Sequence, residues 1–344
     1  MTLLTVHQDN HPTPATSPGT QTGNETGTAT NPHPAATSDP GTRTSTGPGT
    51  GTGTGTTPVD PARMPRLTTT VPREYVHRST LAEVFLTGCE QTGDTHYTLT
   101  AQWPRAHTFF TTPDGTHHHP LQAAETIRQT GLYLAHAELG IPLGHHFLMR
   151  NLHLTTHPQH LTIGPTPTDL TLTATYTPHH PHTKRPTDFT MHITITRNGH
   201  PTATGTGRFT CLTPTTYQRL RHPHTTHTTT ASAATHQPPN PQPTPTPTHY
   251  GRTLPHDIVL TPTPHPHTWQ LTPNPHHPIL FDHTTDHIPG MVLLEAAHQA
   301  ATAHTHPTPT THPTHPTTLH ATFHRYTEHH TPTYITSTSH NDND

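Results

Sequence analysis

Two charged residues in an otherwise apolar stretch are the first candidates for chemistry in this chain. Glu125 follows the run Leu121-Gln-Ala-Ala, and Arg128 comes three residues later. A carboxylate among apolar residues is partly desolvated, which raises its pKa and suits it to act as a general base toward a hydroxyl. Residues three apart share one helical face, so Arg128 can orient this carboxylate or hold a phosphate with its planar guanidinium. The alternative for the pair is a structural role alone.

The same pattern occurs near the end of the chain with one substitution. The run Met291-Val-Leu-Leu precedes Glu295, and His298 stands where the first copy has Arg128. An imidazole is mostly neutral at pH 7 and lacks the fork of an arginine. The loss of a charge-assisted hydrogen bond costs roughly 1.5–3 kcal/mol. We therefore expect Glu125 to belong to the main catalytic pair and Glu295 to contribute less.

The spacing of His283 and His287 raises the question of a metal site. These histidines are four residues apart, and each follows an aspartate, Asp282 or Asp286. The chain has 42 histidines, so chance pairs at this spacing are expected. The segment also runs into a Pro-Gly pair, which favours a loop over the helix that such a spacing needs. We expect no metal ion here, and we expect no cofactor.

The composition limits where a site can be built. The chain has 344 residues, of which only 26% are hydrophobic and 5% aromatic, against 43 prolines. Burial of so little apolar surface cannot offset the conformational entropy lost if the whole chain became ordered. The apolar residues must therefore be concentrated in part of the chain.

Charge and targeting signals narrow the class of protein. The net charge is -4 with neutral histidines, and the 16 lysines and arginines are scattered, which argues against nucleic-acid binding. The first residues lack the basic and apolar regions of a signal peptide, and no run approaches the roughly 20 apolar residues of a membrane span. The two cysteines, Cys89 and Cys211, are too few for a disulfide framework. We expect a soluble, cytoplasmic protein without a membrane partner.

Low-complexity stretches divide the chain into four parts. Residues 1–65 are rich in Thr, Gly and Pro and predict a disordered tail. Residues 66–215 form a first ordered part with interpretable apolar periods. Residues 216–249, rich in Thr, His and Pro, predict an extended, semi-rigid linker. Residues 250–344 form a second ordered part.

The apolar periods of the first ordered part predict an α+β module. We expect two strands, then a helix over residues 121–139 that ends at Gly140, then four more strands. Alternation of apolar residues with threonine marks the later strands, and Asn198-Gly199 is typical of a type I′ hairpin turn between the last two. The expected strands are 81–86, 97–103, 147–154, 170–176, 189–195 and 202–212.

The order of these landmarks repeats in the second ordered part. Residues 77–87 align with residues 251–261, and residues 120–129 align with residues 290–299, which indicates an internal duplication. After its helix the second copy has only two strand-like segments. The counterpart of the terminal hairpin is missing, so we expect a second sheet that is short by two strands.

Six segments of the ordered parts carry the pattern of a known family: Thr70–Arg78, Ala101–Phe110, Ala124–Gly131, His136–His145, His277–His283 and Asp286–Ala297. With them the chain resembles the A-factor-type γ-butyrolactone biosynthesis family, whose members are two fused hotdog domains. The resemblance covers about residues 67–214 and 251–335. It implies two tandem hotdog domains that pair within the chain, each with an antiparallel sheet around a long helix, the second one truncated.

The resemblance also implies a reaction and its partners. In this family a 3-oxoacyl group passes from acyl carrier protein to a hydroxyl of dihydroxyacetone phosphate, a step of γ-butyrolactone autoregulator biosynthesis. The acyl arm enters a tunnel where the two domains pair. The chain would then be an acyltransferase whose catalytic residues are Glu125, Arg128 and Glu295.

Five further residues complete the candidate site as substrate-binding residues. His107 and His283 precede the two helices, where hotdog dehydratases place a catalytic histidine, an analogy that rests on the fold alone. Two other functions stay open. One is a non-catalytic paralogue, motivated by His298 and the missing hairpin, and the other is a hotdog dehydratase or thioesterase acting on carrier-protein substrates. The five residues are His107, His283, His298, Gln129 and Gln299.

Overall fold

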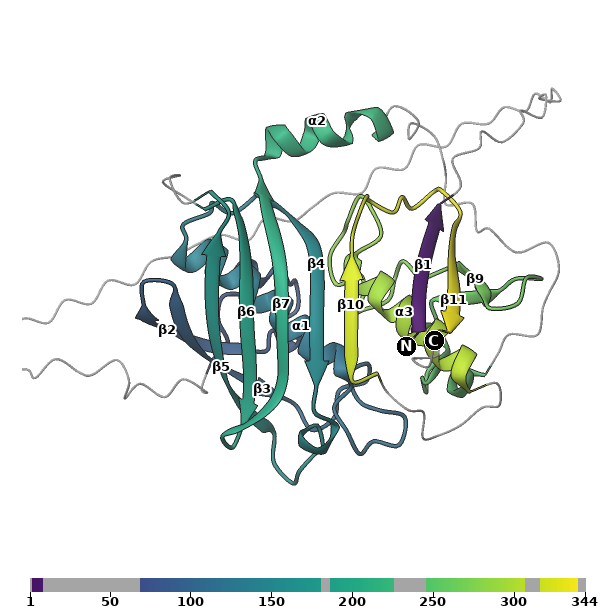
Figure 1. Cartoon of the computed structure of the whole chain (residues 1–344), viewed down its shortest axis with the longest axis horizontal. Helices are drawn as coiled ribbons and strands as arrows, with labels where there is room; N and C mark the ends of the chain where they lie inside the picture. The colour runs from purple at the N-terminus through teal and green to yellow at the C-terminus, as the bar shows by residue number, and fades with distance from the viewer. Residues whose placement is uncertain (1, 9–68, 181–185, 226–245, 307–315, 340–344) are drawn as a thin grey trace, which may run out of the picture. The chain divides into compact units, whose positions relative to one another are not determined.

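The computed structural model describes residues 2–8, 69–180, 186–225, 246–306 and 316–339 (Figure 1). These residues form two antiparallel sheets, and a long helix packs against each sheet. The first helix, α1, belongs to a module that ends near residue 212, and the second, α3, to a module that begins near residue 246. This α+β arrangement confirms the fold class expected from the sequence.

The long helices are almost entirely buried, and α1 buries polar side chains such as Gln122, Thr126 and Thr130 beside its apolar ones. Helix α1 begins on a proline, and His119 Nδ1 accepts a hydrogen bond from the amide of Leu121, which caps this end. In the described part of the chain no helix is both long and apolar enough to cross a membrane. The α-helices are α1 (Pro120–Tyr133), α2 (Pro214–Thr225) and α3 (Gly290–Thr305), and a π-helical turn, η4 (Leu134–Glu138), extends α1. Short 3-10 turns are η2 (Arg73–Val76), η3 (Leu81–Glu83), η5 (Pro158–His160), η6 (Pro247–Tyr250) and η7 (Pro255–Asp257).

The larger sheet has the strand order β10-β4-β7-β6-β5-β3-β2, and every neighbouring pair is antiparallel. Asn198 and Gly199 have φ of 51° and 78°, as a type I′ turn between β6 and β7 requires. Its strands are β2 (Leu86–Gly93), β3 (His96–Trp103), β4 (His146–Thr156), β5 (Thr168–Pro178), β6 (Asp188–Arg197), β7 (His200–Leu212) and β10 (Thr318–Thr322).

The second sheet repeats part of this order, as β1-β11-β9-β8. Strand β11 pairs with β9 as β5 pairs with β3, and β8 pairs with β9 as β2 pairs with β3. Among the described residues the β6–β7 hairpin has no counterpart, as the sequence predicted. Strand β10 is thereby separated from β11 and pairs with β4 of the first module, with Leu319 opposite Leu154. The strands of the smaller sheet are β1 (Thr2–Gln8), β8 (Leu260–Pro262), β9 (Thr268–Leu271) and β11 (Thr333–Ser339).

Strand β1 corrects the assignment of residues 1–65 to a disordered tail. Residues 2–8 pair antiparallel with β11, with Thr5 opposite Thr336 (Figure 1). Because β11 corresponds to β5, β1 takes the place that β6 has beside β5 in the first module. The sequence prediction averaged composition over the whole tail and could not anticipate a sheet edge formed by the other end of the chain. The rest of the predicted tail lies outside the described residues.

Two further expectations differ from the structure. Residues 81–86 were expected to form a strand, but they contain η3, and β2 begins only at Leu86. The start of the predicted linker is helical, because Pro214 opens α2 and the Thr213 hydroxyl accepts a hydrogen bond from the amide of Thr216. Residues 226–245 of that linker lie outside the described residues.

Glycines bring α1 close to strand β7. A Cβ atom on Gly131 would lie 2.5 Å from Cζ of the buried Phe209 ring, and one on Gly205 would lie 2.3 Å from Cδ1 of Ile127. Real Cβ atoms do not approach other atoms this closely, so both positions require glycine for packing. This close approach fixes the height of α1, and of its charged side chains, above the sheet.

We predict that Gly131→Ala lowers the free energy of unfolding by about 1–3 kcal/mol, because the new methyl group displaces the Phe209 ring. The matched control is Gly290→Ala in α3, whose Cβ would meet Phe323 at an ordinary 3.6 Å and should change stability by less than about 0.5 kcal/mol. Urea unfolding followed by circular dichroism measures both. Equal stability of the two variants would show that α1 does not press on β7.

Candidate active site

Glu125 is fully buried in α1 and accepts hydrogen bonds from three side chains. Arg128 donates from Nη2 to Oε1 at 2.7 Å and from Nε to Oε2 at 2.8 Å. Arg78 reaches Oε1 with Nη2 at 2.7 Å, and Gln129 Nε2 donates to the same oxygen at 2.8 Å. The expected pairing of Glu125 with Arg128 is present, and Arg78 adds a second guanidinium.

The protonation state of Glu125 is the reverse of the expected one. Burial raises its pKa, but the attraction of Arg128 and Arg78 and the hydrogen bonds of Arg128 and Gln129 outweigh burial and lower the pKa to about 2. The expectation of a raised pKa was wrong because it considered burial alone and not the charges of Arg128 and of Arg78, which lies 47 residues earlier. A signal was available, since Arg78 aligns with Arg252 in the duplicated segment. At neutral pH Glu125 is an anion that orients two arginines, and it is a weak base.

The second module repeats this buried ion pair with one arginine fewer. Arg252 donates from Nε to Glu295 Oε1 at 2.7 Å and pairs through Nη2 with Oε2. Gln299 Nε2 donates to Glu295 Oε1 at 2.6 Å. His298 occupies the position of Arg128, and its buried ring lies 4.5 Å from the ring of His119.

The two buried arginines tie the modules to each other. Arg78 Nη1 donates to the carbonyl of Ile279 in the second module at 2.9 Å. Arg252 Nη1 donates to the carbonyl of Phe109 in the first module at 2.5 Å, and its guanidinium lies 4.1 Å from the centre of the Phe109 ring. The two contacts join equivalent positions of the duplicated segments. Together with the β4–β10 pairing, they show that the modules pair within the chain.

Gln129 and Gln299 are not placed to bind a substrate. Besides its bond to Glu125, Gln129 Nε2 donates to the carbonyl of Glu83 at 2.7 Å, and its Oε1 accepts from the amide of Phe85. Gln299 makes the same set of contacts in the second module. Both side chains are fully buried, and these bonds use both amide hydrogens. They hold the carboxylates in position.

Both ring nitrogens of His107 likewise contact protein groups. Its Nδ1 accepts hydrogen bonds from the amides of Phe109 and Phe110, and its Nε2 lies 3.3 Å from Glu83 Oε2. His277 repeats this arrangement with Ile279, Leu280 and Asp257. The counterpart of His107 is therefore His277. His283 also precedes its helix, as the sequence analysis noted, but it does not repeat the contacts of His107.

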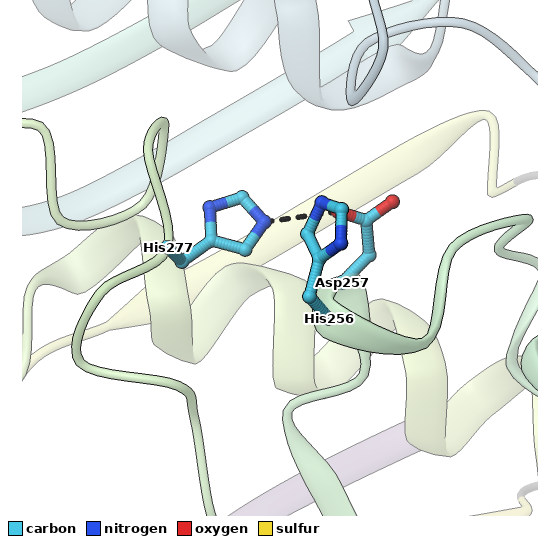
Figure 2. Close-up of side chains that lie close together, drawn as sticks. All are labelled: His256, Asp257 and His277. Atoms are coloured by element: carbon cyan, nitrogen blue, oxygen red, sulfur yellow. Dashed lines mark hydrogen bonds and ion pairs between the residues drawn. The ribbon is translucent and has the colours of Figure 1, made fainter.

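His256, Asp257 and His277 form the one group in the described residues whose ligand atoms are close enough to consider a metal ion (Figure 2). His277 Nδ1 accepts two amide hydrogen bonds, so the proton of the neutral ring is on Nε2, which faces Asp257 Oδ1 at 2.9 Å. This nitrogen has no lone pair for a metal unless the ring loses its last proton. The repeated contact in the first module indicates a structural histidine–carboxylate pair.

A cavity of about 1090 Å³ lies between the modules and exposes the Arg128 side chain. Arg78, His77 and His283 line it together with Arg128, and apolar side chains from both modules form much of the remaining wall. Arg252, Glu295 and His298 are not among its lining residues. The structure thus brings Glu125, Arg128 and His283 together and leaves the second carboxylate elsewhere. Apolar residues of the wall include Leu132, Phe147, Met149, Phe209, Leu280 and Leu294.

The histidines beside the arginines are neutral at physiological pH. Burial lowers the pKa of His283, and the charges of Arg128 and Arg78 lower it further. His77 has a left-handed φ of 52°, and its Nε2 lies 2.9 Å from His136 Nε2. Burial, with Arg128, lowers the pKa of His77 to about 3. The positive charge at this part of the cavity therefore comes from the arginines.

The chain thus has two sheet-and-helix modules with a cavity between them, and a buried arginine of each module donates to a backbone carbonyl of the other. This arrangement defines a tandem hotdog protein. The sequence model of the A-factor biosynthesis hotdog domain matches residues 59–213 and 234–344. The chain belongs to this A-factor biosynthesis family, which confirms the resemblance found in the sequence.

The chain is similar to curated proteins over most of its length. A Streptomyces virginiae protein named 2-oxo-3-(phosphooxy)propyl 3-oxoalkanoate synthase is 43% identical over 269 residues, which cover 78% of this chain and 87% of the relative. A protein of the same name from Streptomyces coelicolor is 34% identical and is covered to 82% of its length. Among solved structures, the chain is similar to a chain of a dehydratase heterocomplex from Xenorhabdus doucetiae, with a TM-score of 0.31 and 13% identity. The match covers 43% of this chain and 94% of that one.

The histidine that precedes the cap of α1 supplies a pH test of the site's framework. His118 is buried, with Nδ1 3.1 Å from Gln122 Oε1 and Nε2 2.9 Å from Thr168 Oγ1. Burial lowers its pKa from 6.5 to about 4. Between these values the unfolded chain binds a proton that the folded chain does not, so stability falls as the pH is lowered through this window.

We predict that His118→Gln reduces this pH dependence. From pH 6.5 down to about 4, wild-type stability loses about 1.4 kcal/mol per pH unit because of this residue, and the variant lacks that contribution. Urea unfolding at a series of pH values measures the slope. His276→Gln, at an exposed position, is the control and should keep the wild-type slope. Parallel curves for wild type and His118→Gln would contradict the prediction.

Proposed function

We propose that the chain transfers a 3-oxoacyl group from acyl carrier protein to a hydroxyl of dihydroxyacetone phosphate. The product is the phosphorylated ester from which a γ-butyrolactone autoregulator is made. The observation that carries the proposal is the cavity between the modules, which combines exposed guanidinium charge with an apolar wall. Its relatives are named as synthases of a 2-oxo-3-(phosphooxy)propyl 3-oxoalkanoate, an ester of these two parts.

Arg128 is the proposed contact for the substrate phosphate. Its Nε and Nη2 are held by Glu125, and Nη2 also donates to the carbonyl of Val76 at 3.2 Å. Its Nη1 has no hydrogen-bond acceptor among the described residues, and the side chain is 18% exposed. A guanidinium fixed on one side and open on the other is suited to a phosphate oxygen. Each guanidinium nitrogen of Arg78 already contacts Glu125 or the carbonyl of Ile279, and Arg78 adds a second positive charge to the cluster.

Glu125 is proposed to act through the arginines. Two guanidinium groups and one carboxylate leave the cluster with a net positive charge, which favours the dianionic end of dihydroxyacetone phosphate. His283 lies beside these arginines and is proposed to contact the same substrate. Glu295 and His298 are proposed to support the second module, because they do not line the cavity.

The apolar wall is the proposed binding site of the acyl chain. It draws on both modules, including Leu132 and Phe209 from the first and Leu280 and Leu294 from the second. An acyl chain loses contact with water along such a wall, which stabilises binding by about 0.8 kcal/mol for each buried methylene. The carrier protein would deliver this chain on its flexible arm. The two cysteines are not in a disulfide, which fits the reducing cytoplasm as the place of action.

Incubation of the purified protein with a 3-oxoacyl carrier protein and dihydroxyacetone phosphate tests the proposal. We expect mass spectrometry to detect the phosphorylated ester and the free thiol of the carrier protein. Release of free acid without dihydroxyacetone phosphate would indicate a thioesterase, and loss of water from a 3-hydroxyacyl substrate would indicate a dehydratase. No product from protein that is folded by circular dichroism would indicate a non-catalytic paralogue.

A pair of variants at equivalent positions tests the phosphate site. We predict that Arg128→Gln lowers kcat/KM for dihydroxyacetone phosphate by about 10- to 150-fold, as expected for one charge-assisted hydrogen bond. His298→Gln changes the counterpart position, which does not line the cavity, and should stay within about threefold of wild type. Steady-state kinetics at saturating acyl carrier protein measure both. Equal effects of the two variants would contradict a single site at Arg128.

A further inference from the structure

A second polar cluster lines the cavity and has no role in the phosphate site. Asp286 Oδ1 lies 2.7 Å from Nδ1 of its neighbour His287, in the loop that leads into α3. Both residues line the cavity with Arg128. An anionic carboxylate only accepts hydrogen bonds, so the proton between the two atoms is on His287 Nδ1.

Asp286 is held by helix α2 of the segment between the modules. The Tyr217 hydroxyl donates to its carboxylate, at 2.7 Å to Oδ1 and 2.9 Å to Oδ2. Arg221, one helical turn later, donates from Nε to Oδ2 at 3.2 Å and from Nη2 to the backbone carbonyl of Asp286 at 2.8 Å. The same guanidinium is anchored by Glu328 at 2.5 Å. These contacts fix the carboxylate and therefore the ring that it orients.

The orientation of His287 leaves its other nitrogen available. With Nδ1 protonated toward Asp286, the neutral ring carries its lone pair on Nε2. In the described part of the chain the structure records no hydrogen bond to this nitrogen, and the side chain is 27% exposed. A carboxylate-oriented imidazole with an open Nε2 is the arrangement that general bases use to take a proton from a hydroxyl.

His287 is distinct from the other histidines of the cavity wall. These are His77, His145, His146, His283 and His324. Within the described residues none of the five is hydrogen-bonded to a carboxylate. His77 already contacts His136 through Nε2, and His283 lies beside two arginines that disfavour a second positive charge.

We propose that His287 is the general base of the acyl transfer and that Asp286 positions it. This inference rests on the proposed function. His287 Nε2 takes the proton of the acceptor hydroxyl as the hydroxyl oxygen attacks the thioester carbonyl. The new C–O bond forms, the C–S bond breaks, and the imidazolium returns the proton to the leaving thiolate. Glu125, anionic and fully hydrogen-bonded, is not required to move a proton.

The surroundings of His287 favour the neutral ring that the step needs. Burial lowers the pKa of His287 from its ordinary value, and the hydrogen bond that His287 donates to Asp286 partly opposes this. The charge of Arg221 lowers it further and that of Glu328 raises it. The remaining titratable groups that face the ring are Tyr217, Tyr326 and His146.

The test compares pH profiles of kcat for wild type and variants in the ester-forming assay. We expect His287→Gln to lower kcat by about 100- to 10,000-fold with little change in KM for dihydroxyacetone phosphate, and to remove the acid limb of the profile. Asp286→Asn should lower kcat and move the acid limb to lower pH, because the carboxylate raises the pKa of His287. His276→Gln, at an exposed position outside the cavity wall, should match wild type.

The outcomes separate this inference from the proposed function. If wild type forms the ester and folded His287→Gln keeps kcat within about threefold and an unchanged acid limb, His287 is not the base and the function stands. If wild type forms no ester, the function and the base fall together. His287→Asn serves as a second variant if the glutamine does not fold, and circular dichroism with thermal unfolding reports the fold of each.

Discussion

Buried guanidinium–carboxylate pairs hold this molecule together. Arg78 with Glu125, and Arg252 with Glu295, are charges removed from water, each of which costs several kcal/mol unless it is paired and fully hydrogen-bonded. Neither arginine finds all its hydrogen-bond acceptors in its own module, because each donates to a backbone carbonyl of the other module. Separation of the modules would leave buried donors without acceptors. The buried ion pair of each module therefore depends on the contact with the other module.

The two copies of the duplicated segment differ at the proposed site. Arg128 faces the cavity, whereas its counterpart His298 lies against His119 away from the cavity wall. The module with the complete sheet carries the arginine pair. The shortened module contributes the loop with Asp286 and His287 and part of the apolar wall. Both modules therefore contribute residues to the proposed site.

Local patterns in the sequence predicted most of the strands, the long helices and part of the site, and the family resemblance supplied the hotdog fold. Helical spacing placed Glu125 and Arg128 on one face, and the repeated landmarks identified the second module and its missing hairpin. Long-range contacts were not accessible. The pKa of Glu125 depends on Arg128 and also on Arg78, which only the folded chain brings near. The interpretation of His283 and His287 as a chance pair did not include the contacts that Tyr217 and Arg221 of a predicted linker make with Asp286.

The pairing of β1 with β11 sets an order for folding during translation. Residues 2–8 are synthesised more than 300 residues before their partners, residues 333–339. The first sheet needs only β10 from the later part of the chain, so most of it can form while synthesis continues. The second sheet must close a loop of more than 300 residues, and contacts between residues so far apart in sequence form slowly. Strand β1 can therefore pair only after β11 has been synthesised.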